Sequence, residues 1–259
     1  MPDTLATRLE TALKLTETAS RIALDHFEGA LHIDTKDDAS PVTIADQETE
    51  QSIRAQLEEA FPLDGIYGEE FDNLRLDSNT IWVVDPIDGT RSFIAGVPLF
   101  GMLLAMVQDN HPVLGICRLP ALGQVYSAAK GAGATRNGTP IKVSQQTKLS
   151  EAMLFINEGE GIYEDEPQVF ERLTKAGKLR RLSYDCQPHA LVASGQIDAV
   201  VDYNLKPYDY LAMVPIIEEA GGVITDWQGA TLDFNSDGRV VTASTPKLHA
   251  ELLALLNAD

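Results

Sequence analysis

The sequence predicts a mixed fold of α+β and α/β character, and three observations support this prediction. Apolar residues near the N-terminus recur at the spacing of an amphipathic helix. Short runs rich in Val, Ile and Leu follow between residues 81 and 129, and such runs are typical of strands. After about residue 144, strand-like and helix-like segments alternate. With 259 residues, of which 44% are hydrophobic, the chain can bury a continuous core.

We expect the N-terminal half, residues 1–145, to begin with helices and to continue as an antiparallel or mixed sheet. Helices are expected over residues 3–27 and 45–60, and Pro62 ends the second one. The dipeptide Asn137-Gly138 favours a tight hairpin turn. The strands of this half are expected over residues 81–84, 102–107, 113–117 and 125–129.

We expect the C-terminal half, residues 146–259, to alternate strands with helices. The sequence contains no repeat and no Pro/Gly-rich linker, so the two halves are expected to pack as one compact body. The expected strands cover residues 152–157, 197–201, 222–225 and 240–243. The expected helices cover residues 166–175, 188–194, 208–220 and 247–256.

The charge balance excludes several classes of partner. The chain has 20 Lys and Arg against 39 Asp and Glu, which gives a formal net charge of −19. Such a surface repels phosphate backbones, so we expect no nucleic-acid partner. No window of about 18 apolar residues could span a membrane, and the N-terminus has no secretion signal, so we expect a cytoplasmic protein without a membrane partner. Cys117 and Cys186 are far apart in the sequence, unlike a zinc or redox pair, and we expect both to be reduced.

Three acidic clusters lie where predicted elements begin or end. They are Gly68-Glu69-Glu70, the segment from Asp85 to Asp88 with Pro86 between them, and Asp209. Because Pro86 should end the strand and Gly89 should turn the chain, a bend can aim both Asp carboxylates at one point. Crowded carboxylates favour a hard divalent cation, commonly Mg²⁺. The alternatives are a simple turn or helix cap for each Asp and a solvated surface pair for the two Glu residues.

Taken together, these clusters resemble the motifs of the inositol monophosphatase superfamily of Mg²⁺-dependent phosphatases. The likeness covers nearly the whole chain and implies a layered αβαβα sandwich, the fold shared with fructose-1,6-bisphosphatase. Residues 89–101, 185–186 and 205–209 resemble the histidinol-phosphatase branch of this superfamily. The strings that carry the resemblance are Lys36, residues 42–46, Gly68-Glu69-Glu70, residues 82–90, Pro207-Tyr208-Asp209 and residues 219–226.

The resemblance implies a set of metal ligands and catalytic residues. Two to three Mg²⁺ ions are expected, and a water that they activate attacks the phosphorus in line. Thr90, with Glu69 or Asp46 behind it, is expected to orient this water and take up its proton. If a helix follows Gly89, its first backbone N–H groups form a cradle for the phosphate. The expected metal ligands are Glu69, Asp85, the carbonyl of Ile87, Asp88, Asp209 and, for a weaker third ion, Asp46.

The expected substrate is L-histidinol phosphate, which is hydrolysed to L-histidinol and phosphate in histidine biosynthesis. This substrate carries an ammonium group and an imidazole, so its pocket should be acidic, and Asp185 and Asp202 are the candidates for that pocket. Each also has a structural alternative, since Asp202 ends a predicted strand and Asp185 could cap the next helix. Asp202 departs from the Glu that we expect in close relatives. The expected substrate-binding residues are Asp88, Gly89, Thr90, Arg91, Asp185, Asp202 and Asp209.

Two other functions remain open at this point. The first is hydrolysis of inositol phosphate or of a broader range of sugar or nucleotide monophosphates. The second is binding of divalent cations by an acidic protein that has no catalytic activity. The family resemblance also implies a homodimer, which composition cannot test.

Overall fold

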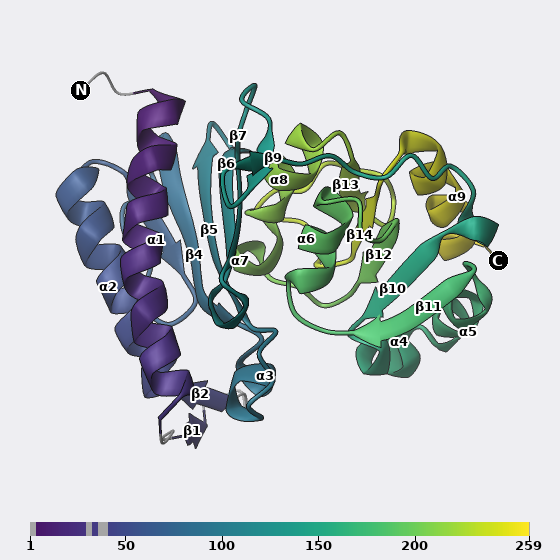
Figure 1. Cartoon of the computed structure of the whole chain (residues 1–259), viewed down its shortest axis with the longest axis horizontal. Coiled ribbons are helices and arrows are strands. Elements are labelled where there is room, and N and C mark those ends of the chain that lie inside the picture. The colour runs from purple at the N-terminus through teal and green to yellow at the C-terminus, as the bar shows by residue number, and fades with distance from the viewer. Residues whose placement is uncertain (1–3, 30–32, 36–40, 259) are drawn as a thin grey trace.

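The computed structural model describes residues 4–29, 33–35 and 41–258, with the backbone alone described over 33–35 and 41–43. Two sheets and three groups of helices form successive layers across the long axis of the molecule (Figure 1). Helices cover the outer face of each sheet, and a further group lies between the sheets. The layered αβαβα sandwich implied by the resemblance is therefore confirmed.

The N-terminal half forms the seven-stranded sheet, whose order is β3-β4-β5-β6-β7-β8-β9. Strand β3 is parallel to β4, and every other neighbouring pair is antiparallel, so the sheet is mixed as expected. The strands are β3 (Gly65–Gly68), β4 (Thr80–Asp88), β5 (Gly101–Gln108), β6 (His111–Leu119), β7 (Gln124–Ala129), β8 (Ala134–Arg136) and β9 (Thr139–Pro140).

Helices α1 (Leu5–Phe27) and α2 (Ile44–Ala60) pack on the outer face of this sheet (Figure 1). Along the chain, these two helices are separated by the antiparallel strands β1 (Ile33–Thr35) and β2 (Pro41–Thr43). The inner side of both helices and one face of the sheet share a core that includes Leu15, Ile53 and Trp82.

The C-terminal half forms the five-stranded sheet, whose order is β11-β10-β12-β14-β13. Its strands are β10 (Met153–Asn157), β11 (Leu179–Ser183), β12 (Ala199–Asp202), β13 (Val223–Asp226) and β14 (Val240–Ala243). Helices α4 (Gly159–Asp165), α5 (Pro167–Lys175) and α9 (Pro246–Leu256) lie on its outer side (Figure 1).

The middle layer comes from the C-terminal half and packs against both sheets. It consists of α6 (Gln187–Ala193), α7 (Pro207–Tyr210) and α8 (Met213–Glu219). The largest buried cluster lies here and joins residues of β5 and β6 with residues of β12 and β14. At Gly115 the backbone of this layer approaches β6 so closely that a Cβ would lie 2.0 Å from the carbonyl oxygen of Ala212. A continuous core therefore binds the two halves, while the division at residue 145 stays a prediction.

Most predicted elements are confirmed within a few residues. The expected hairpin turn lies between β8 and β9, and both Asn137 and Gly138 have positive φ (50° and 74°), as a two-residue turn of type I′ requires. The expected helix over residues 208–220 was wrong in one respect, because the chain forms two short helices, α7 and α8, with Leu211 and Ala212 between them. Strands β1, β2, β3 and β11 and helix α4 were not predicted.

The strand expected over residues 81–84 was predicted to stop at Pro86, and this prediction was wrong. Strand β4 continues to Asp88. Its pairing with β5 shifts register between Asp85 and Asp88, so that the two residues Pro86 and Ile87 lie opposite the single residue Met102. Such a bulge accommodates a proline, because the inserted residues leave the ladder of hydrogen bonds.

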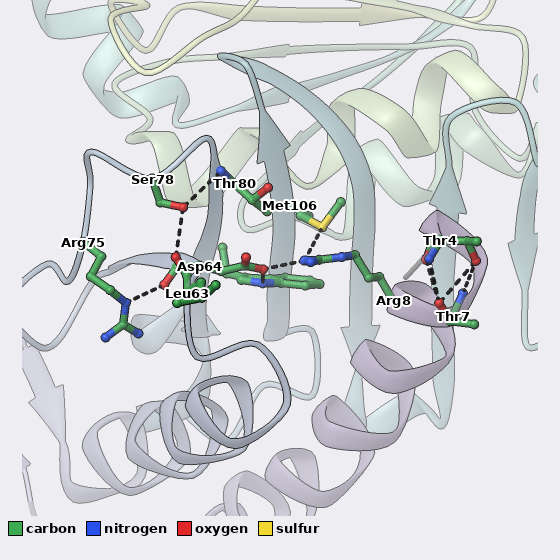
Figure 2. A network of polar contacts seen from close by, with 10 residues as sticks. Thr4, Thr7, Arg8, Leu63, Asp64, Arg75, Ser78, Thr80 and Met106 are labelled. Atoms are coloured by element: carbon green, nitrogen blue, oxygen red, sulfur yellow. Dashed lines mark hydrogen bonds and ion pairs between the residues drawn. The ribbon is translucent and has the colours of Figure 1, made fainter. Parts of the chain in front are cut away.

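Figure 2 shows the polar network that attaches the start of α1 to the seven-stranded sheet. Asp64, in the turn after α2, is 7% exposed, and its carboxylate accepts hydrogen bonds from Arg8 Nη1 and from Trp82 Nε1 (2.9 Å). Arg75 Nε donates to the carbonyl oxygen of Asp64 at 2.9 Å. The guanidinium of Arg8 also lies 4.5 Å from the centroid of the Phe61 ring. One carboxylate therefore joins α1, the turn after α2, and β4.

We predict that Arg8→Met lowers the free energy of unfolding by about 3 kcal/mol, because it leaves the buried Asp64 carboxylate without its cationic partner. Arg21→Met is the matched control, since Arg21 pairs with Glu17 on the same helix but is exposed, and it should cost under about 0.5 kcal/mol. Urea unfolding of both variants measures the difference. Equal losses would show that the Arg8–Asp64 pair adds nothing beyond a surface ion pair.

Candidate active site

The bulge at the end of β4 presents the first group of acidic residues. Asp85 is 1% exposed, whereas Asp88 is partly open to solvent. Residues three apart on a regular strand point to opposite faces of the sheet. The register shift between Asp85 and Asp88 instead lets their carboxylates lie close together. The sequence analysis expected a bend at this point, and the bend is made by a bulge rather than by the end of the strand.

Helix α3 (Thr90–Ile94) begins directly after the bulge, with Gly89 at its N-cap. Gly89 has φ +86°, in the left-handed region, and a Cβ on it would lie 2.5 Å from Cγ of Asp185. Only glycine meets both conditions without strain. The Thr90 hydroxyl lies 3.4 Å from Asp46 Oδ1 and 3.4 Å from the carbonyl oxygen of Ile87, so it can donate to one of them at a time.

The loop that carries Glu69 is held by helix α2. Glu50 is fully buried and accepts hydrogen bonds from Arg54 Nε (2.6 Å) and from the backbone N–H of Glu70 (2.8 Å). Arg54 in turn donates to the carbonyl oxygens of residues 71 and 72 at 3.0 Å each. Asp46 is fully buried one turn before Glu50 on the same helix. Helix α2 therefore supplies one acidic group itself and fixes the loop that supplies another.

Asp209 reaches the site from the C-terminal half. It lies in helix α7, which packs against β4 and β5. Its Oδ2 accepts a hydrogen bond from the backbone N–H of Lys206 at 2.6 Å, which fixes the carboxylate at the start of the helix. A further contact joins the C-terminal half to β4, because the backbone N–H of Cys186 donates to Asp88 Oδ2 at 2.5 Å.

One carboxylate oxygen from each of Asp85, Asp88 and Asp209 lies within 4.8 Å of the other two. Burial, followed by repulsion from Glu69, Asp88 and Asp209, raises the pKa of the Asp85 carboxyl well above its usual range. Burial likewise raises the pKa of Asp88 strongly and that of Asp209 to about 7. Carboxylates this close repel each other unless a proton or a cation lies between them.

The residues present fit a hard divalent cation. Asp85 Oδ1 is buried and accepts no hydrogen bond from the described part of the chain. An orphaned buried carboxylate oxygen is costly, and an ion coordinated by it would remove that cost. All the candidate ligand atoms of this cluster are oxygens, which Mg²⁺ prefers. Glu69, half-buried beside Asp85 and Asp209, and the carbonyl of Ile87 lie next to the same cluster.

A cavity of about 550 Å³ opens beside this cluster. Asp85 lies outside its lining, whereas Glu69, Asp88 and Asp209 lie on one part of its wall. The N-terminal end of α3 and the start of α4 continue the wall. The remaining charged and polar lining residues are Thr90, Arg91, Ser92, Glu158, Glu160, Tyr184, Asp185, His189, Asp202, Tyr203, Asn204 and Tyr208.

Asp185 lies in the cavity wall and does not cap the following helix. Its Oδ2 accepts a hydrogen bond from Ser92 Oγ at 2.6 Å, and α6 has no side-chain cap. Ser92 is therefore engaged as a hydrogen-bond donor to Asp185. The next residue, Cys186, has its Sγ 3.6 Å from Sγ of Cys117, so the fold brings together two free thiols that are far apart in the sequence.

Asp202 is 2% exposed at the end of β12 and is surrounded by donors. Its Oδ2 accepts from His189 Nε2 (2.9 Å) and from Asn157 Nδ2 (2.7 Å), and its Oδ1 accepts from the backbone N–H of Tyr203 (2.8 Å). His189 Nδ1 lies 2.9 Å from Thr242 Oγ1. The short side chain of Asp202 is thus held from inside the protein, although the residue also borders the cavity.

The structure thus places most of the predicted site residues in the lining of one cavity and adds some that were missed, whereas Asp46, Asp85 and Ile87 are buried outside that lining. Lys36 lies outside the described residues. Glu158 was missed because it lies beyond every motif of the resemblance, in a loop whose conformation the sequence does not signal. Glu50 and Arg54 were missed because an ion pair four residues apart on a helix is usually a surface feature. Their burial could not be inferred without the loop that covers them.

Comparison with known proteins shows the family of this chain. The family model for the inositol monophosphatase family matches residues 4–258, and the chain therefore belongs to the inositol monophosphatase family. A histidinol-phosphatase from Chlorobaculum parvum is 40% identical over 236 residues, which cover 90% of this chain and 90% of that protein. One from Mycobacterium tuberculosis is 35% identical over 95% of this chain and 96% of its own length. A solved structure of an inositol monophosphatase from Zymomonas mobilis superposes with a TM-score of 0.89 at 37% identity, covering 98% of this chain and 99% of that one.

The predicted family and enzyme class are confirmed by these comparisons. The protein is a phosphoric monoester hydrolase of this family. Among the helices of the described residues, none is long and apolar enough to cross a bilayer. The individual roles of the site residues stay predictions.

We predict that Asp85→Asn stabilises the metal-free protein by roughly 1–3 kcal/mol at pH 7.5, because it keeps the shape of the side chain and removes a carboxyl that the fold must either protonate or bury as a charge in a repelling cluster. The folded state raises the pKa of Asp85, so it retains a proton that the unfolded chain releases above about pH 4. The stability of the metal-free wild type should therefore fall as the pH rises from about 4 towards 7.

Thermal unfolding in EDTA at pH 5 and pH 7.5 measures this effect. The variant should show a smaller drop between the two pH values than the wild type, and added Mg²⁺ should raise its Tm less. A variant that is less stable than the wild type in EDTA at pH 7.5 would show that the cluster is not electrostatically strained.

Proposed function

We propose that this protein is a Mg²⁺-dependent phosphatase that hydrolyses L-histidinol phosphate to L-histidinol and phosphate, as a step of histidine biosynthesis. The observation that carries the choice of substrate is the charge of the cavity. Its lining contains seven carboxylate residues and one arginine, Arg91. The histidinol-phosphatase names of the relatives from Chlorobaculum parvum and Mycobacterium tuberculosis support the same choice.

Two to three Mg²⁺ ions would be held by the acidic cluster. Glu69, Asp85, the carbonyl of Ile87, Asp88 and Asp209 are the proposed ligands of the main positions, and Asp46 is the proposed ligand of a weaker third one. When bound, Mg²⁺ would offset the charge of the carboxylates, polarise the phosphate and lower the pKa of a nearby water. The buried, unpaired oxygen of Asp85 supports this role most directly.

The chain's own residues would orient the attacking water and take up its proton. The Thr90 hydroxyl can donate to Asp46 Oδ1, and its lone pairs are then free to accept a hydrogen bond from the water. Asp46, fully buried, and Glu69, at the edge of the cavity, are the carboxylates that could receive the proton. Gly89, Thr90 and Arg91 would contact the phosphate where α3 begins.

The remote part of the cavity would receive the rest of the substrate. L-Histidinol phosphate carries an ammonium and an imidazole, and both are favoured beside carboxylates. Asp185 and Asp202 are the proposed binding residues at this end, with Asp185 held by Ser92 and Asp202 held by His189 and Asn157.

An inositol-1-phosphate phosphatase is the second candidate. The observation in its favour is the 37% identity to the inositol monophosphatase from Zymomonas mobilis, which is close to the 40% identity to a histidinol-phosphatase. Inositol phosphate offers only neutral hydroxyls, so an acidic wall gives it no ion pair.

We expect purified protein to release phosphate from L-histidinol phosphate in Mg²⁺ with a kcat/KM at least about tenfold above that for inositol 1-phosphate, because one added charge-assisted contact contributes on the order of 1.5–3 kcal/mol. EDTA should abolish release from both. Equal values for the two esters would reject the specific substrate. Absence of release from any ester, with Mg²⁺ binding intact, would favour a cation-binding protein without turnover.

Asp88→Asn is predicted to lower kcat by roughly a hundredfold or more while the protein stays folded, because it removes one ligand charge and keeps the side-chain shape. Steady-state kinetics with circular dichroism as the folding control measures this. Asp226→Asn is the matched control, since Asp226 lies on β13 away from the cavity lining. A near-normal kcat for Asp88→Asn would reject its role as a ligand.

We also propose that the protein acts as a homodimer in the cytoplasm. Strand β11 is an edge of the five-stranded sheet and exposes Leu179 and Leu182, with Tyr184 directly after it. Exposed apolar side chains on an unpaired strand favour association with a second copy. Light scattering after size-exclusion chromatography should give twice the mass of one chain, and Leu182→Glu should shift it towards the monomer.

A further inference from the structure

Among the described residues, Glu158 is a half-buried acidic group of the cavity whose carboxylate accepts no hydrogen bond from the protein. Glu158 lies between β10 and α4, is half-buried and lines the cavity. Within the described part of the chain, its carboxylate takes part in no hydrogen bond and no ion pair. By contrast, Asp88, Asp185, Asp202 and Asp209 each accept at least one hydrogen bond from the protein.

The backbone fixes the position of this side chain. Glu158 has φ 46° and ψ 39°, a left-handed conformation that is unfavourable for a residue with a Cβ. The neighbouring Gly159 packs against Phe170 and Leu182, each of which would lie 3.2 Å from a Cβ at that position. The turn is therefore held by packing on the outer side, and Glu158 borders the cavity on the other.

A second unsatisfied acceptor lies next to Glu158. Asn157 is 1% exposed, and its Oδ1 accepts no hydrogen bond from the described residues. Its Nδ2 donates to Asp202 Oδ2 and to the carbonyl oxygen of Asp185, which both line the cavity. Asn157 is not itself a lining residue, but its amide lies directly behind two residues that are, so two consecutive residues at this end of the cavity have an acceptor without a donor from the described residues.

The negative charges around Glu158 are only partly offset by a positive one. Burial, together with repulsion from Asp202, Asp185 and Glu160, raises the pKa of Glu158 to about 7, and Arg91 opposes this only in part. A cation placed beside this carboxylate would restore its charged form and gain more than it would at an exposed site.

We propose that Glu158 is a specificity-determining residue that forms an ion pair with the cationic end of the phosphate ester. This inference rests on the proposed function for the identity of the ester, L-histidinol phosphate, and it goes further by naming the partner of the positive charge. Glu160, which also lines the cavity, is exposed and therefore gives a weaker, solvent-screened contact. Asp202 already accepts three hydrogen bonds from the protein and Asp185 accepts one, which leaves Glu158 as the carboxylate without such a bond among the buried and half-buried ones described at this end.

The test compares Glu158→Gln with Glu164→Gln. Both changes remove one charge from helix α4 or its N-cap, but Glu164 is exposed and does not line the cavity. For each protein, kcat/KM is measured with L-histidinol phosphate and with its N-acetyl derivative, which lacks the ammonium charge. The wild type should prefer the cationic ester, and Glu158→Gln should reduce this preference by roughly tenfold to a hundredfold, mainly through KM.

Glu164→Gln should keep the wild-type preference, and Glu158→Asp should restore part of it. A wild-type preference that Glu158→Gln leaves unchanged would overturn the proposal, because another group would then bind the charge. So would a loss of kcat shared equally by both esters, which indicates a role in the chemical step or in the fold.

A binding measurement separates this proposal from the proposed function. Isothermal titration of L-histidinol, in the presence of Mg²⁺ and inorganic phosphate, reports recognition of the cation without turnover. If neither ester is hydrolysed but L-histidinol binds the wild type at least tenfold more tightly than it binds Glu158→Gln, the assignment of Glu158 stands and the phosphatase function falls. If the two proteins bind L-histidinol equally, the assignment of Glu158 falls whatever the activity.

Discussion

The mutual repulsion of buried carboxylates is the constraint on which the rest of this structure depends. Asp85 and Asp88 come from the seven-stranded sheet, and Asp209 comes from a helix of the other half. Nothing in the energetics of folding alone favours placing three such groups within 4.8 Å of one another. The fold enforces it through the core between the sheets, which is large enough to offset a locally unfavourable arrangement.

Several devices hold this arrangement, and each works on the backbone rather than on the carboxylates themselves. The bulge at Pro86 bends β4 without ending it. Gly89 adopts a left-handed conformation at a position where a Cβ would also collide with Asp185. The buried pair of Glu50 and Arg54 fixes the loop of Glu69 from helix α2. These contacts fix the backbone that carries the acidic groups, and thereby the positions of the carboxylates.

Much of the fold could be predicted from the sequence because its periodicity reports burial directly. The apolar spacing of residues 5–27 and the runs in β5 and β6 gave the right element type. Short elements were missed where tertiary contacts override local preference: β11 contains two arginines and is almost wholly exposed, and α4 begins at a left-handed Glu158. The single helix expected over residues 208–220 is interrupted at Leu211 and Ala212, and Pro215 four residues after Leu211 has no N–H to donate to the Leu211 carbonyl.

The residues of the site likewise fall into those that the sequence revealed and those that it did not. The ligand motifs could be recognised because they combine special backbone residues with carboxylates at fixed spacing, as in Asp85-Pro86-Ile87-Asp88-Gly89. Glu158, Asn157 and the thiol pair of Cys117 and Cys186 could not be found, since their significance arises only from neighbours brought together by folding. A sequence reports which chemistry is available, whereas the packing decides which groups remain without partners.

The close approach of Gly89 and Asp185 has a consequence for redesign of the pocket. Any side chain at position 89 would collide with the carboxylate of Asp185, so the two positions cannot be varied independently. The loop after β4 and the start of α6 thus form one mechanical unit, although 96 positions separate them along the chain (185 − 89). Trimming residue 185 could widen the pocket towards bulkier esters and would remove this collision, but position 89 would still require glycine, because its φ of +86° strains any residue that has a Cβ.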